Sequence, residues 1–249
     1  MKKIVVMSGK GGVGKSTVAA NLAYSLASEG HKVGIFDSDF HGPSIPQMLG
    51  VKTDFLGAEE ENIQPVEVNP DMKAVSMDFL LPDDDSAVIW RGPLKMKAIK
   101  QFIDEVEWGD IDYLVIDLPP GTGDEPLSIS QQLTDLDGSI IVTTPQEVAV
   151  QAVRRSIDFS EKVGMKVLGV VENMSSLTCP NCGENIDVFG SGGGKKMAEE
   201  LGINFLGSIP LDPEIMKSGE EGRSLMEMGS DSSKAFEEIV KNLKKELGD

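Results

Sequence analysis

This chain of 249 residues has few cysteines, few aromatic residues and few basic residues relative to acidic ones. Its two cysteines, three positions apart, cannot form the disulfide framework of a small secreted domain. With 23 basic and 41 acidic side chains, the formal net charge is -18, which repels nucleic acid and anionic lipid surfaces. No apolar run reaches the roughly 18 residues that a membrane span needs, and the first residues lead straight into an apolar run. We therefore expect a cytoplasmic protein without a signal peptide, and neither a nucleic-acid nor a membrane partner.

Apolar runs alternate along the chain with segments whose apolar residues recur at helical spacing. This alternation is typical of parallel βαβ units, so we expect one α/β domain over residues 1–249, with a mostly parallel central sheet flanked by helices. Strands are expected at residues 3–7, 32–36, 74–77, 113–116, 139–143, 166–171 and 204–209. Helices are expected at residues 16–29, 94–106, 148–163 and 232–247.

Two features of the remaining sequence need separate interpretation. Residues 54–71 are rich in acids and poor in pattern, which predicts an excursion from the sheet. The last predicted helix carries an apolar stripe that includes Phe236, Ile239 and Leu243. Such a stripe suits a helix that lies on a membrane surface. Packing on the sheet is the interpretation we favour, because the polar face of the helix mixes Glu with Lys.

The strongest motif lies between the first predicted strand and the first predicted helix. Residues 9–17 match the P-loop pattern G-x-x-x-x-G-K-[ST]. Its glycines let backbone N–H groups surround phosphate oxygens, while Lys15 supplies a full charge to the β- and γ-phosphates and the Ser16 hydroxyl suits Mg²⁺. The motif predicts a nucleotide site at residues Gly9, Lys10, Gly11, Gly12, Val13, Gly14, Lys15, Ser16 and Thr17.

The same glycines also fit the dinucleotide pattern G-x-G-x-x-G, with Asp37 where a ribose-binding acid would lie. Lys15 and Ser16 directly after the last glycine favour a mononucleotide, as does the second lysine, Lys10, inside the loop. A further apolar strand ends in Asp117, as expected for the acid that holds the metal ion through water. A structural turn with a solvated Lys10 is the remaining alternative. The guanine-reading pattern Asn-Lys-x-Asp is absent, so ATP is favoured over GTP.

Polar residues follow several of the predicted strands. Asp37 and Asp39 point the same way if their strand continues, so that one can serve the Mg²⁺ shell and the other can orient or deprotonate the attacking water. An asparagine at the end of a strand, Asn173, can read adenine, although a turn asparagine is the simpler interpretation. Because parallel strands end at one edge of the sheet, we expect convergence around the nucleotide of residues 8–17, 37–39, 117–124, 143–145 and 173–182.

Cys179 and Cys182 form a Cys-Pro-Asn-Cys-Gly turn of the kind that binds Zn²⁺ or iron–sulfur clusters. One pair cannot complete a four-thiolate site, and the chain has no third cysteine, but two chains related by symmetry can complete it. A thioredoxin-like redox pair, a pair of inert thiols and a zinc knuckle remain alternatives.

Taken together, these motifs resemble the deviant Walker A family of P-loop ATPases, which includes MinD, ParA, the nitrogenase iron protein and the Mrp/ApbC group. Along essentially its whole length the chain is similar to Mrp/ApbC-type iron–sulfur carrier ATPases. The cysteine pair and an Arg-Gly-Pro string separate it from MinD and ParA. The matching segments are residues 9–17, 37–44, 90–93, 117–124, 169–174, 179–182, 189–194 and 207–214.

This resemblance implies a homodimeric ATPase with slow, switch-like hydrolysis. It implies that a labile [4Fe–4S] cluster, bridged by Cys179 and Cys182 of both subunits, is delivered to apo iron–sulfur proteins. The alternative functions are a MinD- or ParA-like positioning ATPase and a non-enzymatic scaffold bridged by zinc.

The resemblance also implies roles for individual residues of the nucleotide site. Lys10 crosses the dimer interface to the phosphates of the partner. Asp39 handles the attacking water, and Asp37 belongs to the surroundings of the Mg²⁺. Asn173 and the backbone near Pro210 contact the adenine.

Overall fold

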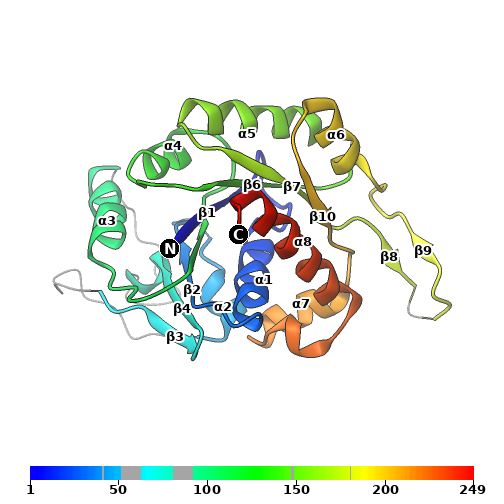
Figure 1. The fold of residues 1–249 in the computed structure, drawn as a ribbon, viewed down its shortest axis with the longest axis horizontal. Helices are drawn as coiled ribbons and strands as arrows, with labels where there is room; N and C mark the ends of the chain where they lie inside the picture. Colours follow the sequence, from blue (N-terminus) through cyan, green and yellow to red (C-terminus); the bar gives the residue numbers. More distant parts are fainter. Residues whose placement is uncertain (41, 52–62, 81–91, 147–148, 180) are drawn as a thin grey trace.

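A computed structural model describes residues 1–40, 42–51, 63–80, 92–146, 149–179 and 181–249. Among these residues, eight strands form one sheet in the order β10-β7-β6-β1-β5-β2-β4-β3 (Figure 1). Neighbouring strands are parallel except at the edge, where β3 and β4 run antiparallel. The strands are β1 (Lys2–Met7), β2 (Val33–Asp37), β3 (Val66–Asn69), β4 (Met72–Ser76), β5 (Tyr113–Asp117), β6 (Gly138–Thr143), β7 (Val167–Glu172) and β10 (Phe205–Ser208).

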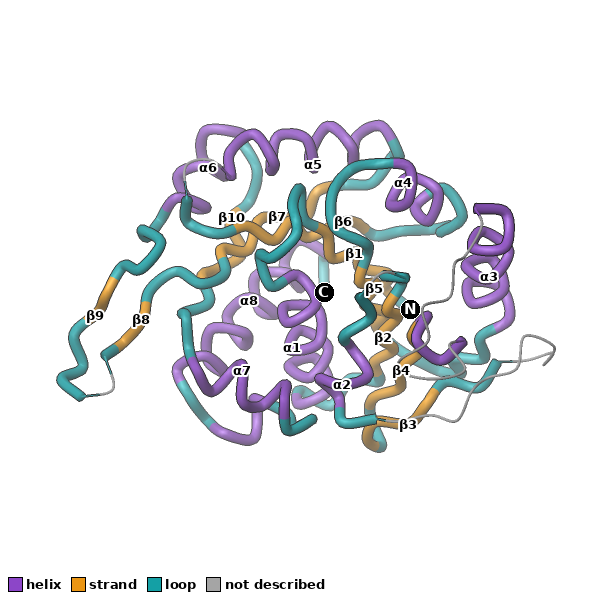
Figure 2. The backbone as a smooth tube through the Cα atoms, turned by 180° about the vertical axis from the view of Figure 1, so that it is seen from behind, coloured by secondary structure: helices purple, strands orange, loops and turns teal. Residues whose placement is uncertain are grey.

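Helices cover both faces of this sheet (Figures 1 and 2). Two apolar clusters, one on each face, hold them in place. The first face carries α1 (Lys15–Ser28), α2 (Ile45–Leu49), α7 (Pro213–Glu220), η3 (Leu225–Met228) and α8 (Asp231–Leu247). The second face carries α3 (Gly92–Glu105), α4 (Asp124–Ser130), α5 (Val150–Lys162) and α6 (Gly193–Leu201), with the short η1 (Met77–Leu80) after β4.

The central strand β1 shows why its sequence is apolar at every position. Ile4 and Val6 belong to the cluster on one face, whereas Val5 and Met7 belong to the cluster on the other. A parallel strand that is covered on both faces reads as a continuous apolar run rather than an alternating one. The mostly parallel α/β architecture predicted from the sequence is therefore confirmed.

The amphipathic helix α8 packs on the sheet. Phe236, Ile239, Val240 and Leu243 are fully buried in the cluster on the first face. The membrane-surface interpretation of this stripe is therefore wrong for these side chains. In the part of the chain that the structure describes, no helix is long and apolar enough to cross a bilayer.

The strands expected from the sequence lie within one or two residues of their expected ends, and within the main sheet β3 has no counterpart among them. It lies in the second half of the stretch expected to leave the sheet, and it pairs along the outer edge of β4. Its four residues, Val-Glu-Val-Asn, are half-buried or exposed, and an alternation of only two apolar residues is too short to stand out in the sequence. The described residues do not include residues 54–62 of that stretch, nor His41 and residues 90–91 of the segments that match the Mrp/ApbC group.

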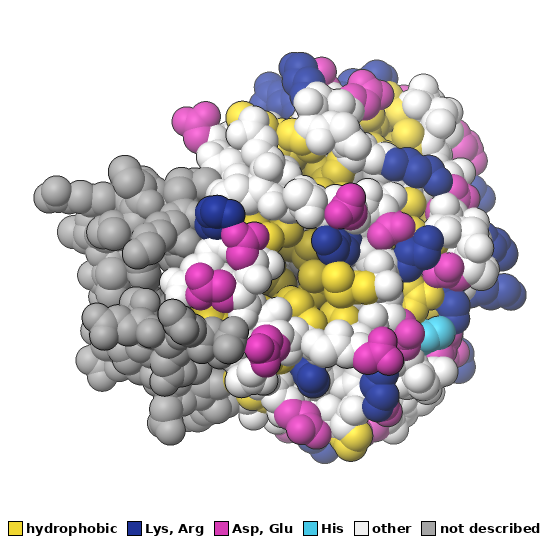
Figure 3. Space-filling view, turned by 60° about the vertical axis from the view of Figure 1, so that its left-hand side comes forward, with side chains coloured by type: hydrophobic (Ala, Val, Ile, Leu, Met, Phe, Trp, Pro, Cys, Tyr) yellow, Lys and Arg dark blue, Asp and Glu magenta, His cyan; other side chains and the backbone are white. Residues whose placement is uncertain are grey.

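Two features of the surface bear on function. On the face drawn in Figure 3, the acidic and basic side chains of the described residues are interspersed. A two-stranded arm projects from the body of the fold between β7 and α6 (Figures 1 and 2). Its strands, β8 (Leu177–Thr178) and β9 (Asn185–Ile186), are antiparallel. We refer to residues 177–191, except residue 180, as the cysteine arm.

Candidate nucleotide site and cysteine arm

The loop between β1 and α1 has the backbone that a phosphate cradle requires. Gly12 and Gly14 have φ angles of 77° and 78°, a left-handed conformation that glycine adopts without strain. A Cβ atom on Gly14 would lie 2.2 Å from Nδ2 of Asn173. The loop and its neighbours enclose a cavity of ≈ 250 Å³ at the N-terminus of α1, where backbone N–H groups favour an anion. The cavity is lined by Ser8, Gly11, Gly12, Gly14, Lys15, Ser16, Thr17, Asp39, Ser44, Met48 and Pro120.

Beneath this cavity, Lys15 forms a buried ion pair with Asp117. The Lys15 Nζ atom donates to Oδ1 of Asp117 at 2.5 Å and to Oγ of Ser16 at 3.3 Å. Lys15 is 6% exposed and Asp117 is fully buried at the end of β5. Burial raises the pKa of Asp117, and the charge of Lys15 opposes that rise. An incoming phosphate therefore competes with a carboxylate for the same ammonium group.

The oxygens beside this pair fit a magnesium ion. Mg²⁺ takes hard oxygen ligands, and a P-loop Ser together with a strand-end Asp is the usual donor set. Ser16 lines the cavity, and the buried Oδ2 atom of Asp117 has no hydrogen-bond partner among the described residues. Such an orphaned oxygen is costly unless a bound group completes it.

The two acids at the C-terminal end of β2, Asp37 within it and Asp39 just after it, are placed differently. Asp39 lines the phosphate cavity, where it can reach a water molecule. The carboxylate of Asp37 is fully buried and accepts hydrogen bonds from the backbone N–H groups of Ser44 and Ile45, both at 3.2 Å, and from the Ser76 hydroxyl. Asp37 thus fixes the position of the start of α2 relative to the end of β2. Its assignment to the surroundings of Mg²⁺ stays a prediction.

Burial and the nearby charge of Asp117 raise the pKa of Asp37 from 3.8 to about 7. Between these two pKa values the folded protein keeps the Asp37 proton, whereas the unfolded chain has released it. The free energy of unfolding therefore falls as pH rises from about 4 toward about 7. Asn does not titrate, so the free energy of unfolding of Asp37→Asn is expected to fall less steeply with rising pH than that of wild type. The two slopes are expected to differ by up to about 1.4 kcal/mol per pH unit. Urea titrations of the nucleotide-free protein between about pH 5 and about pH 8 measure the difference. Glu238→Gln, at an exposed position, is the control, and identical slopes for Asp37→Asn and wild type would contradict the expectation.

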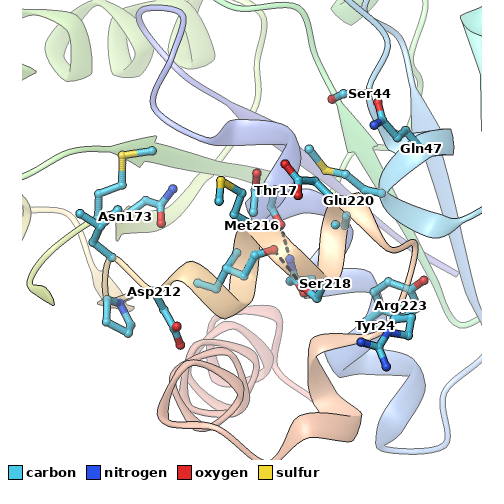
Figure 4. A pocket seen from close by; sticks show the side chains of 18 residues that line it. Thr17, Tyr24, Ser44, Gln47, Asn173, Asp212, Met216, Ser218, Glu220 and Arg223 are labelled. Carbon is cyan, nitrogen blue, oxygen red and sulfur yellow. Dashed lines mark hydrogen bonds between the residues drawn. The ribbon is translucent and has the colours of Figure 1, made fainter. Parts of the chain in front are cut away.

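A second cavity of ≈ 390 Å³ adjoins the first, since Thr17, Ser44 and Met48 line both. Figure 4 shows Asn173 and Asp212 at one end of it and Tyr24 and Arg223 at the other. Its lining is mainly apolar, as a base and ribose pocket requires. The predicted base-contacting residues are among the lining residues, which are Thr17, Ala20, Asn21, Tyr24, Ser44, Gln47, Met48, Asn173, Met174, Pro210, Leu211, Asp212, Ile215, Met216, Ser218, Gly219, Glu220 and Arg223.

Lys10 occupies a different position from Lys15. Its Nζ atom donates to Oε1 of Gln146 at 3.4 Å, and its side chain is half-buried. Lys10 is absent from the lining of the phosphate cavity, whereas Lys15 is part of it. Lys10 is thus not part of the phosphate cavity of its own loop, and its role across a dimer interface stays a prediction.

The two cysteines do not converge on the nucleotide site, contrary to our expectation for residues 173–182. They lie on the projecting arm, because the chain leaves the sheet after β7 as a two-stranded excursion (Figure 2). Both thiols are free; Cys179 is half-buried and Cys182 is exposed. Backbone N–H groups of Cys182 and Asn181 lower the pKa of Cys179, which favours the thiolate that binds metals. Within the described residues, no cluster of three or more His, Cys, Asp or Glu side chains is arranged to hold a metal ion.

Comparisons with known proteins show which family the chain resembles. The profile of a family described as "ParA: NUBPL iron-transfer P-loop NTPase" matches residues 1–244. The iron-sulfur cluster carrier protein of Saccharolobus solfataricus is 53% identical over 240 residues, which cover 96% of this chain and 81% of that protein. The cytosolic Fe-S cluster assembly factor CFD1 of Saccharomyces cerevisiae is 46% identical and matches 98% of this chain and 87% of that protein. A solved structure, the nucleotide-binding protein of Archaeoglobus fulgidus in complex with ADP, is 42% identical with a TM-score of 0.80, over 94% of this chain and 91% of that one.

Proposed function

This chain belongs to the ParA family of NUBPL-type iron-transfer P-loop NTPases, and on that premise we propose that it is an ATP-dependent carrier of iron–sulfur clusters. One observation carries the proposal. The same chain holds a P-loop cavity in its body and a pair of free thiols on a projecting arm. A nucleotide can therefore act at one place while a metal cargo is bound and released at another.

The nucleotide that we propose is ATP, bound with Mg²⁺. The cavity at the loop suits phosphates, and the adjoining apolar cavity suits the nucleoside. Asn173 and the backbone at Pro210 lie on the lining of that second cavity, where an amide can pair with adenine. Mg²⁺ would be held by Ser16 and Asp117 and would neutralise charge on the phosphates.

For hydrolysis, we assign Asp39 to the attacking water and Lys15 to the phosphates of the same chain. Asp39 borders the phosphate cavity, so its carboxylate can accept a hydrogen bond from a water placed in line with the terminal phosphate. Lys10 would supply a further positive charge to the phosphates of a second subunit. Hydrolysis would be slow without that contact and would act as a switch.

The cargo that we propose is a labile [4Fe–4S] cluster shared by two copies of the chain. Cys179 and Cys182 supply two thiolates, and a four-iron cluster of this type takes four. A homodimer would place the two pairs opposite each other, and acceptor apoproteins would receive the cluster from the exposed side of the arm. The proposed location is the cytoplasm, in line with the cytosolic name of the yeast relative.

Anaerobic reconstitution with iron and sulfide tests this function. We expect one [4Fe–4S] cluster per two chains, a dimer by light scattering, and transfer of the cluster to an apo [4Fe–4S] enzyme that gains activity. Protein that binds zinc but neither iron nor sulfide would point to the non-enzymatic scaffold. Co-sedimentation with DNA or liposomes at low salt, without cluster binding, would point to a positioning ATPase.

A further inference from the structure

The cysteine arm joins the body of the fold at two roots (Figures 1 and 2). The first root, residues 173–176, directly follows β7. The second root, residues 192–194, begins α6. Any motion of the arm relative to the body must pass through these two short segments. The contacts of these segments therefore determine which parts of the body can change the position of the arm.

The first root is bound to the segment that lines the base cavity. Both the backbone N–H and the hydroxyl of Ser175 donate to the carbonyl of Ile209, at 3.0 and 3.1 Å. The N–H of Leu211 donates to the carbonyl of Ser176 at 2.8 Å. Pro210 and Leu211 themselves line the cavity. A nucleoside in that cavity therefore touches the segment that holds the first root.

The second root is bound to the carboxylate of Glu172, the last residue of β7. Glu172 is fully buried and accepts hydrogen bonds from the N–H groups of Gly192, at 3.1 Å, and Gly194, at 2.5 Å. These N–H groups lie at the start of α6, where the helix dipole favours a carboxylate. The contact leaves no room for side chains: a Cβ on Gly194 would lie 2.9 Å from Cβ of Glu172, and one on Gly193 would lie 1.9 Å from the Pro145 carbonyl oxygen.

The residue next to Glu172 is held by the phosphate-binding loop. Nδ2 of Asn173 donates to the carbonyl of Val13 at 2.9 Å, and Asn173 is 5% exposed. Met174 has a φ angle of 59°, an uncommon left-handed conformation for a residue other than glycine, and it lines the base cavity. The Asn173 amide keeps its oxygen and a second N–H for a base, so a base that pairs with it competes with Val13 for the orientation of the amide.

We propose that Glu172 is a positioning residue that transmits occupancy of the nucleotide site to the cysteine arm. Asn173 and Glu172 are consecutive, so a shift of Asn173 from Val13 toward a base moves the end of β7. The two hydrogen bonds that Glu172 accepts then carry this shift to the second root, while the Ser175 contacts carry it to the first. This inference rests on the proposed function, because it takes the ligand of the base cavity to be ATP.

The arm contains both cysteines of the chain, so their rate of alkylation by iodoacetamide reports on the arm alone. In cluster-free wild-type protein, a saturating non-hydrolysable ATP analogue with Mg²⁺ is expected to change this rate by about fivefold or more, the low end of typical coupling between two sites. Glu172→Gln keeps the shape of the side chain but removes its charge. It is expected to bind the analogue with wild-type affinity and to lose this response. The matched control is Glu184→Gln on the exposed tip of the arm, which is expected to keep the response.

Two results would overturn the proposal. One is an alkylation rate in wild type that does not change when the analogue binds, and the other is a Glu172→Gln protein whose rate changes as much as that of wild type. Should Glu172→Gln not fold, hydrogen exchange in the wild type decides instead. The N–H groups of Gly192 and Gly194 must then change their protection when the analogue binds, and unchanged protection overturns the proposal. These readouts need no cluster, so a protein that never holds iron and sulfide would refute the carrier function without deciding this inference.

Discussion

Cys179→Ser is expected to abolish cluster binding while leaving ATP affinity unchanged. In a symmetric dimer, each substitution removes two of the four thiolates at once. Loss of an outer partner of a metal ligand already costs about 10–100-fold in affinity, so loss of two ligands is expected to cost more than about 100-fold. Iron and sulfide content after anaerobic reconstitution measures the loss, and titration with a fluorescent ATP analogue measures the retained nucleotide site.

The matched control for this prediction is Asn181→Ser, which introduces the same residue between the two cysteines. The backbone N–H of Asn181 bonds the Cys179 sulfur, and the substitution retains it. The control protein is therefore expected to load a cluster as wild type does. A Cys179→Ser protein that retains wild-type iron and sulfide would show that the cluster is bound elsewhere, and the assignment of the arm would be wrong.

The long elements of the fold follow from the sequence, but several short helices do not. α8 spans enough turns for the apolar spacing to show, whereas α1 is buried on most sides and is predicted from its place after the P-loop. The five residues of α2 include Pro46 and are too few to show a period. α6 begins with Gly193 and Gly194, which have low helix propensity, so only contacts with the strand ends explain why a helix starts there.

The phosphate-binding part of the site is equally predictable, because one loop and a few strand ends supply it. The direction of the cysteine arm is not predictable, since residue spacing does not tell where a two-stranded excursion points. The position of Glu172 was also missed, although the run of glycines at residues 192–194 signals a close backbone approach. The end of the base cavity at Tyr24 and Arg223 was not predictable either. It is formed by α1 and by the segment that follows α7, which are far apart in the sequence.

Lys15→Ala is expected to remove measurable ATP binding and to make the nucleotide-free protein less stable. Charge-assisted hydrogen bonds contribute about 1.5–3 kcal/mol each, so losing the contacts to two phosphates weakens binding by about 100-fold or more. The carboxylate of Asp117 also loses its buried partner, and breaking such a pair costs about 3–5 kcal/mol. Isothermal titration with ATP and urea unfolding measure the two effects.

The pH dependence of this variant separates its two effects. Burial already raises the pKa of Asp117, and removing the Lys15 charge raises it further, so the carboxyl of the variant keeps its proton to a higher pH. The stability deficit of Lys15→Ala relative to wild type is therefore expected to grow as pH rises, whereas the loss of ATP binding persists at every pH. Lys10→Ala makes the same change in the same loop outside the phosphate cavity of its own chain, and is expected to bind ATP more tightly than Lys15→Ala does and to hydrolyse it more slowly than wild type. If Lys15→Ala bound ATP as tightly as Lys10→Ala does, the loop at residues 9–17 would not be the phosphate site.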